Sequence, residues 1–124
     1  MTREEFEKLV NEGISSIPEK FLKRLENIDI VIEERPTNDQ LKKVNIQNPF
    51  CLFGLYEGIP KTKRGSSYGM VLPDKITIFK DAIERSARNE EEIKEIVKNT
   101  VWHEIAHHFG MNEKEVREKE RKKY

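Results

Sequence analysis

Hydrophobic residues recur at helical spacing over the first 28 residues of the chain. The first set predicts a helix with acidic residues in its first turn. This set comprises Phe6, Leu9, Val10, Ile14 and Ile17. Ser16 followed by Pro18 indicates that a second helix then begins. The apolar positions of this second helix are Phe21, Leu22, Leu25 and Ile28.

The pattern changes to an alternating one after the second helix. Ile28, Ile30 and Ile32 occupy every second position, which is typical of a half-buried strand, and Pro36 ends it. Thr37 or Asn38 is the candidate N-cap of a short helix that runs to about residue 44. Further strands are predicted at residues 51–56, 68–72 and 75–79, with a polar, turn-rich stretch at 61–67.

The longest predicted helix runs from near Asn89 to Phe109, and its pattern changes along its length. Its first half has one apolar stripe, formed by Ile93, Ile96, Val97 and Thr100. In its second half apolar residues surround the helix on nearly every side, at Val101, Trp102, Ile105, Ala106 and Phe109. Such a helix is expected to be buried. The polar groups on its one remaining face therefore need a partner, because an isolated buried charge is very costly.

That polar face carries His-Glu-x-x-His at residues 103–107. His103 and His107 are four residues apart, so they lie on one face of the helix and can bind a single ion, for which Zn²⁺ is well suited. Glu104 lies about 100° round the helix from His103. It is therefore near the metal without being forced to bind it. This is the expected position of a general base that acts on a metal-bound water.

A catalytic zinc normally has three protein ligands and one open position. Gly110 can end the helix and reverse the chain, which brings a residue shortly after it back toward the metal. Glu113 is the favoured third ligand, because it is the nearest carboxylate after Gly110. A glutamate from a following helix, which Asn112 is expected to cap, is the alternative. The candidates there are Glu115, Glu118 and Glu120.

Two neighbouring residues are given structural roles. His108 points about 100° away from His107 and therefore off the metal face, so it is expected to be packed or to support the site. Met111 directly follows Gly110, where an apolar residue commonly packs back onto the last helical turn. A five-residue motif also arises by chance, but the patterned helix, the glycine and the following carboxylate together favour a metal site.

Composition narrows the class of protein. The 124 residues are expected to form a single domain, residues 1–124. With 23 acidic and 23 basic residues the formal net charge is zero, so there is no basic surplus to indicate nucleic-acid binding. A single cysteine, Cys51, excludes an intramolecular disulfide, a thiolate zinc cage and the zinc deaminases. A charged N-terminus and the lack of a long apolar run predict a soluble, cytoplasmic protein without membrane contact.

Three segments of the chain resemble the small bacterial zincin-like metallopeptidases, a family long described as a domain of unknown function. They are GLYEGIPKTKR (54–64), LPDKITIF (72–79) and TVWHEIAHHFGMNEKEV (100–116), in the C-terminal two-thirds of the chain. The resemblance implies a compact zincin core in which the motif helix packs beneath a small mixed sheet. It also implies that His103 and His107 bind the metal and that Glu104 is the catalytic carboxylate. Larger metallopeptidase families have His, Asp or Glu as the third ligand.

The sequence thus predicts an α+β domain that acts as a zinc-dependent metalloendopeptidase-like enzyme on peptide or protein substrates. Tyr68, Tyr56 and Arg64 are the candidates to stabilise the oxyanion, and the strand at 68–72 is a candidate edge for an extended peptide. Two alternatives remain. The first is a zinc-stabilised binding module without catalytic turnover. The second is a structural helix whose histidines are packed and metal-free.

Overall fold

The computed structural model describes residues 1–26, 28–58 and 74–108. Two helices, α1 (Arg3–Ser15) and α2 (Glu19–Leu22), precede the first strand, β1 (Ile28–Glu33). Helix α3 (Asn38–Lys43) follows it. The second half contains β2 (Gly54–Glu57), β3 (Asp74–Phe79), α4 (Lys80–Ser86) and α5 (Glu90–His108). Short 3-10 turns occur at Lys23–Leu25 and Pro49–Cys51. The α+β class is confirmed.

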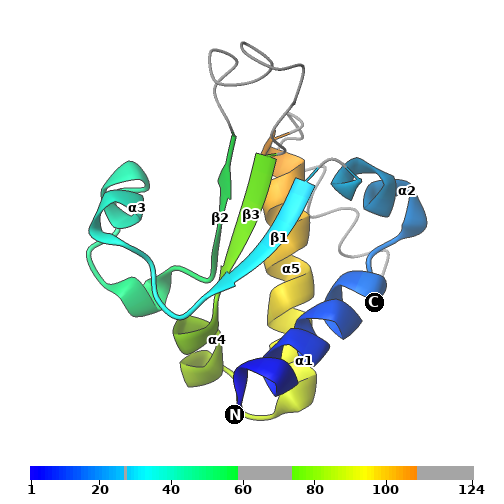
Figure 1. Ribbon diagram of the computed structural model, residues 1–124, viewed down its shortest axis with the longest axis horizontal. Coiled ribbons are helices and arrows are strands. Elements are labelled where there is room, and N and C mark those ends of the chain that lie inside the picture. The colour runs from blue at the N-terminus through cyan, green and yellow to red at the C-terminus, as the bar shows by residue number, and fades with distance from the viewer. Residues whose placement is uncertain (27, 59–73, 109–124) are drawn as a thin grey trace.

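The three strands form a mixed sheet in the order β1-β3-β2. β1 is parallel to β3, with Val31 opposite Thr77, and β2 is antiparallel to β3, with Tyr56 opposite Ile76. Helix α5 contacts both β2 and β3 and also packs against α1. Figure 1 shows α3 beyond the β2 side of the sheet, and α1 and α2 beyond the β1 side. The sheet therefore packs on the long motif helix, as expected.

The core has two clusters, one on each face of the sheet. The larger one joins α1, α2, the sheet and α5. In it Trp102 is fully buried, and the centroid of its ring lies 4.1 Å from the ring centroid of Phe21. Four residues of the motif helix are fully buried: Val101, Trp102, Ile105 and Ala106. The smaller cluster comprises Leu41, Leu52, Leu55, Phe79 and Ala82. The prediction that apolar residues bury the second half of the helix is confirmed for these four residues, whereas Phe109 lies outside the described residues.

The close contact between α1 and α5 depends on a glycine. A Cβ atom at Gly13 would lie 2.7 Å from the carbonyl oxygen of Lys94 and 3.4 Å from the side chain of Val97. Real Cβ atoms do not approach a backbone oxygen so closely, so only glycine allows the two helices to pack at this distance.

Most of the predicted elements are confirmed, with some changes at their ends. Thr37 is the N-cap of α3 and forms a capping box with Gln40. The strand predicted at 51–56 begins later, at Gly54, because Asn48 caps the turn at Pro49–Cys51. Helix α4 was not predicted, since it follows β3 directly with no glycine or proline between them. The strand predicted at 68–72 and the helix after Asn112 lie outside the described residues.

Of the helices in the described ranges, none combines the length and the apolar character needed to cross a bilayer. The cytoplasmic location stays a prediction.

Candidate active site

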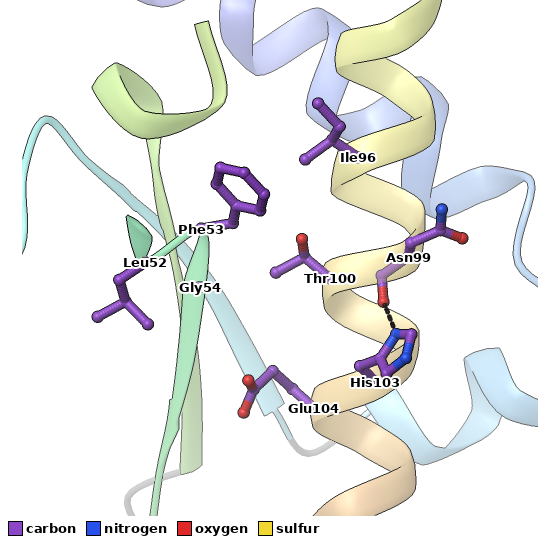
Figure 2. A pocket seen from close by; sticks show the side chains of 8 residues that line it. All are labelled: Leu52, Phe53, Gly54, Ile96, Asn99, Thr100, His103 and Glu104. Atoms are coloured by element: carbon purple, nitrogen blue, oxygen red, sulfur yellow. Dashed lines mark hydrogen bonds between the residues drawn. The ribbon is translucent and has the colours of Figure 1, made fainter. Parts of the chain in front are cut away.

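The carboxylate of Glu104 joins helix α5 to strand β2. The backbone N–H of Tyr56 donates a hydrogen bond of 3.0 Å to its Oε2 atom. This amide does not pair with β3, because the backbone groups of successive residues in a strand point to opposite sides. The N–H of Phe79 donates to the carbonyl of Phe53 at 2.9 Å, so Phe53, Leu55 and Glu57 direct their backbone groups toward β3. The N–H of Tyr56 is thus directed to the open edge, where Figure 2 shows Glu104 pointing from α5 toward β2.

The surroundings of Glu104 affect its affinity for a proton. Burial is the largest influence and raises the pKa of its carboxyl group, because the charged form is poorly solvated. The hydrogen bond from Tyr56 and the nearby His107 and His103 act in the opposite direction, but the pKa remains above its ordinary value. A carboxylate with a raised pKa is a better proton acceptor, which is the property expected of a general base.

The imidazole of His103 is oriented by the helix itself. Its Nδ1 atom lies 2.9 Å from the backbone carbonyl oxygen of Asn99, one turn earlier. A carbonyl oxygen can only accept a hydrogen bond, so in the neutral ring the proton is on Nδ1. The other nitrogen, Nε2, then carries the lone pair that a metal requires. Such a contact is typical of the partners that orient metal-binding histidines.

The two histidine rings lie about 1 Å farther apart than a shared tetrahedral metal ion requires. Their centroids lie 6.3 Å apart, and their planes differ by 33°. An imidazole bound through one nitrogen has its centroid roughly 3.2 Å from zinc, so two such rings lie no more than roughly 6.4 Å apart. At a tetrahedral angle the spacing falls to roughly 5 Å. His107 is exposed and can make this movement of about 1 Å by rotating its side chain.

No third metal ligand is found among the described residues. Residues 1–26, 28–58 and 74–108 contain no group of three or more His, Cys, Asp or Glu side chains that could hold a metal ion. Glu113, the predicted third ligand, lies outside these ranges, as do Glu115, Glu118 and Glu120. The structure therefore brings together His103, Glu104 and His107, while the assignment of Glu113 stays a prediction.

A cavity of about 430 Å³ opens beside these groups, between β2 and α5. Its lining is formed by Leu52, Phe53, Gly54, Ile96, Asn99, Thr100, His103 and Glu104. Figure 2 shows Phe53 and Ile96 facing each other at one end, with His103 and Glu104 at the other. Helix and strand approach each other closely at Gly54, where a Cβ atom would lie 2.5 Å from Cγ2 of Thr100.

Comparison with known protein families gives a match that covers this whole arrangement. The family model described as zincin-like metallopeptidase matches residues 25–123, which include the three strands and all of α5. The chain belongs to the zincin-like metallopeptidase family. Zinc is the usual cofactor of this family, and peptides are its expected substrates. No curated protein matches the chain.

Of the three residues predicted to stabilise the oxyanion in this zincin-like domain, the structure describes Tyr56. The phenol of Tyr56 donates a hydrogen bond of 2.6 Å to Oδ2 of Asp74. This contact couples the ends of β2 and β3. Tyr68 and Arg64 lie outside the described residues, so their roles stay predictions.

Two groups that orient the site, the N–H of Tyr56 and the carbonyl of Asn99, are not predicted from the sequence. Both belong to the backbone, and every residue except proline carries the same pair of groups. No signal in the sequence distinguishes them. The spacing between Asn99 and His103 is the one partial exception, because a side chain on a helix is close to the carbonyl four residues earlier.

Proposed function

We propose that the protein is a zinc-dependent peptidase in which Glu104 handles the proton. One observation carries the proposal: the carboxylate of Glu104 is hydrogen-bonded to the edge strand at Tyr56, beside the two histidines and in the lining of a cavity. Glu104 is partly buried, which costs free energy, and carboxylates whose pKa is raised by burial are often found at functional sites. Membership of the zincin-like family supports the same reaction class.

The metal would be held by His103, His107 and Glu113. Zinc bound there would supply Lewis-acid chemistry, by lowering the pKa of a water molecule and polarising the scissile carbonyl. The Nδ1 contact of His103 with Asn99 keeps that ring in the orientation and tautomer that a ligand needs.

Glu104 would accept the proton of the attacking water and later pass it to the leaving amine. The hydrogen bond from Tyr56 holds Oε2 and so restricts rotation of the carboxylate, which also orients Oε1. Because Glu104 is partly buried, its carboxylate takes up a proton more readily than a freely solvated carboxylate does.

A library of peptides from a digested proteome tests the proposal. The zinc-loaded protein is expected to cleave a subset of these peptides, and a chelator is expected to abolish cleavage until zinc is added back. The zinc-stabilised binding module makes a different prediction, because it would keep one zinc per chain and leave every peptide intact. Mass spectrometry of the library together with elemental analysis of the protein separates the two.

A further inference from the structure

We propose that a second cavity, beside α4, binds a free α-amino acid through its carboxylate and its ammonium group. The cavity has a volume of about 320 Å³ and is lined by Arg35, Asp81, Glu84 and Arg85. Arg85 would bind the carboxylate, and Glu84 would bind the ammonium. Figure 1 shows α4 at the end of the sheet where α5 begins, away from the motif at the other end of α5. The inference therefore does not rest on the proposed peptidase function.

The topology of the sheet brings three segments together at this cavity. Glu33 and Phe79 are paired at the last positions of the parallel strands β1 and β3. Arg35 and Asp81 each follow two residues later, so they lie at the same end of the sheet. Because β2 is antiparallel to β3, it begins at this end, and Phe50 lies in the turn just before it.

Three of the lining residues lie on one face of α4. Asp81, Glu84 and Arg85 have the spacing i, i+3 and i+4. At this spacing Asp81 and Arg85 could form an ion pair within the helix. Instead, the Nε–H of Arg35 donates a hydrogen bond of 2.6 Å to Oδ2 of Asp81. The guanidinium carbon of Arg85 lies 3.7 Å from the ring centroid of Phe50. Asp81 and Arg85 thus have different partners, although both line the cavity.

The guanidinium of Arg85 is suited to bind a carboxylate. A guanidinium that lies over an aromatic ring keeps its N–H donors for other partners, because the donors lie in its own plane. Among the described residues, none forms an ion pair with Arg85. The planar fork of donors matches the two oxygens of a carboxylate. The ring of Phe50 also lies 5.2 Å from the guanidinium carbon of Arg35, so one ring helps to position both cations.

The two carboxylates of the lining favour an ammonium group as the second contact. Arg35 engages Oδ2 of Asp81, and Nζ of Lys80 lies 2.9 Å from Oε1 of Glu84. A carboxylate has about four acceptor sites, so each can also accept a hydrogen bond from a ligand. The lining contains two cations and two anions, which favours an occupant without net charge. A free α-amino acid meets this requirement, because its carboxylate and ammonium are attached to one carbon atom.

The size and the charge of the cavity restrict the class of ligand. A volume of about 320 Å³ lies at the lower end of the range for small-ligand sites, which suits a single amino acid. A phosphate ion would be repelled by Asp81 and Glu84, and a simple amine would be repelled by the two arginines. The two termini of an extended peptide are too far apart to enter one small cavity together.

Three ligands that differ by one group test the inference. They are L-alanine, N-acetyl-L-alanine, which lacks the ammonium, and L-alaninamide, which lacks the carboxylate. Each is titrated into the ¹⁵N-labelled, zinc-loaded protein at about pH 6.5, where α-amino groups are charged. Alanine is expected to shift the amide signals of Asp81, Glu84 and Arg85. It is also expected to bind at least roughly tenfold more tightly than either analogue, because each analogue loses hydrogen bonds between charged groups.

Two results of these titrations would overturn the inference. The first is an affinity for either analogue equal to that for alanine, which would show that one charged group is sufficient. The second is a set of shifts confined to the region of His103 and Glu104, which would show that alanine binds at the zinc site.

Matched variants test the assignment of Arg85. Arg85→Ala is expected to abolish alanine binding, because the carboxylate loses its partner. Arg88→Ala is the control, since Arg88 is also an exposed arginine but lies just after α4 and outside the lining. It is expected to bind alanine as the wild type does. Equal alanine affinity in Arg85→Ala and the wild type would contradict the assignment.

The variant Glu84→Gln tests the contact with the ammonium. It is preferred to a substitution of Asp81, which would also release Arg35. Glu84→Gln is expected to weaken alanine binding at least roughly tenfold and to leave the affinity for N-acetyl-L-alanine no lower, because that ligand has no ammonium to lose. An equal loss of affinity for both ligands would contradict the role of Glu84 and with it the amino-acid site.

Discussion

The backbone N–H of Tyr56 lies 3.0 Å from Oε2 of Glu104 and donates a hydrogen bond to it. This contact ties the edge strand of the sheet to the motif helix. It uses an amide that makes no bond to β3, so the strand keeps its pairing while it orients the carboxylate. The site therefore depends on the position of β2 as well as on α5.

Removing that amide is expected to slow catalysis. Tyr56→Pro lacks the N–H, whereas Tyr56→Ala keeps it, and both variants lose the phenol that contacts Asp74. Proline is tolerated where an edge-strand N–H faces away from the sheet. Relative to Tyr56→Ala, the proline variant is expected to lose roughly 10- to 100-fold in kcat, because a hydrogen bond to a charged group is lost. Equal kcat values, with equal zinc content and circular dichroism, would show that the contact does not position Glu104.

Removing a metal-binding histidine is expected to abolish zinc binding. His107→Ala leaves two of the three proposed ligands, so its affinity is expected to fall by more than the roughly 10–100-fold typical of losing a supporting residue. His108→Ala is the matched control, because the sequence places that residue off the metal face. Elemental analysis should give about one zinc per chain for the wild type and the control. Equal zinc in His107→Ala would rule the site out.

The third ligand can be assigned by comparing glutamates. Glu113→Ala is expected to weaken zinc binding markedly in a competition titration, because a ligand is lost. The alanine variants of Glu115, Glu118 and Glu120 are expected to bind zinc as the wild type does. A larger effect from any of these three would transfer the assignment to that residue.

Glu57 is expected to make stability depend on pH. Its carboxylate accepts hydrogen bonds from Gln40 (2.8 Å) and Lys43 (3.1 Å), which join α3 to β2. Burial acts to raise the pKa of Glu57, but these hydrogen bonds and the charge of Lys43 outweigh it and lower the pKa below its ordinary value of 4.5. The unfolded chain then binds the proton more readily. The contribution to stability is thus present above about pH 4.5 and is lost as the pH falls through the folded-state pKa.

Urea unfolding measures this contribution. Between about pH 6 and pH 3 the wild type is expected to lose roughly 0.5–1.5 kcal/mol more stability than Glu57→Gln. Glu33→Gln, at an exposed position in β1, is the control and is expected to behave as the wild type. Equal losses in the free energy of unfolding for Glu57→Gln and the wild type would contradict this role of Glu57.

Side-chain periodicity explains how much of the fold could be predicted from the sequence. The apolar side chains in the second half of α5 point to nearly every side of the helix, and their pattern located its polar face correctly. Four of them are fully buried: Val101, Trp102, Ile105 and Ala106. The pairing of β2 with β3, in contrast, depends on which strand of a small sheet lies in the centre, and no local pattern encodes that. Helix α4 was missed because Phe79 ends a strand and also precedes the helix, with no turn between them.

The cavity between β2 and α5 also could not have been predicted, because it depends on a contact between residues that are far apart in the sequence. Gly54 is visible in the sequence, but its importance comes from Thr100, 46 positions later, whose methyl group occupies the space of a side chain at Gly54. Only the packing of α5 against β2 brings these two residues together.

The substitution Glu104→Gln tests the central proposal most directly. The amide keeps the shape of the side chain but cannot accept a proton as a base, so kcat on a cleaved peptide is expected to fall by at least roughly 10²–10⁴-fold. KM is expected to change little, because the loss arises in the chemical step, and one zinc per chain should remain. Glu90→Gln, in the first turn of the same helix, should retain wild-type activity. Cleavage by Glu104→Gln at the wild-type rate would contradict the role of Glu104 and with it the proposed mechanism.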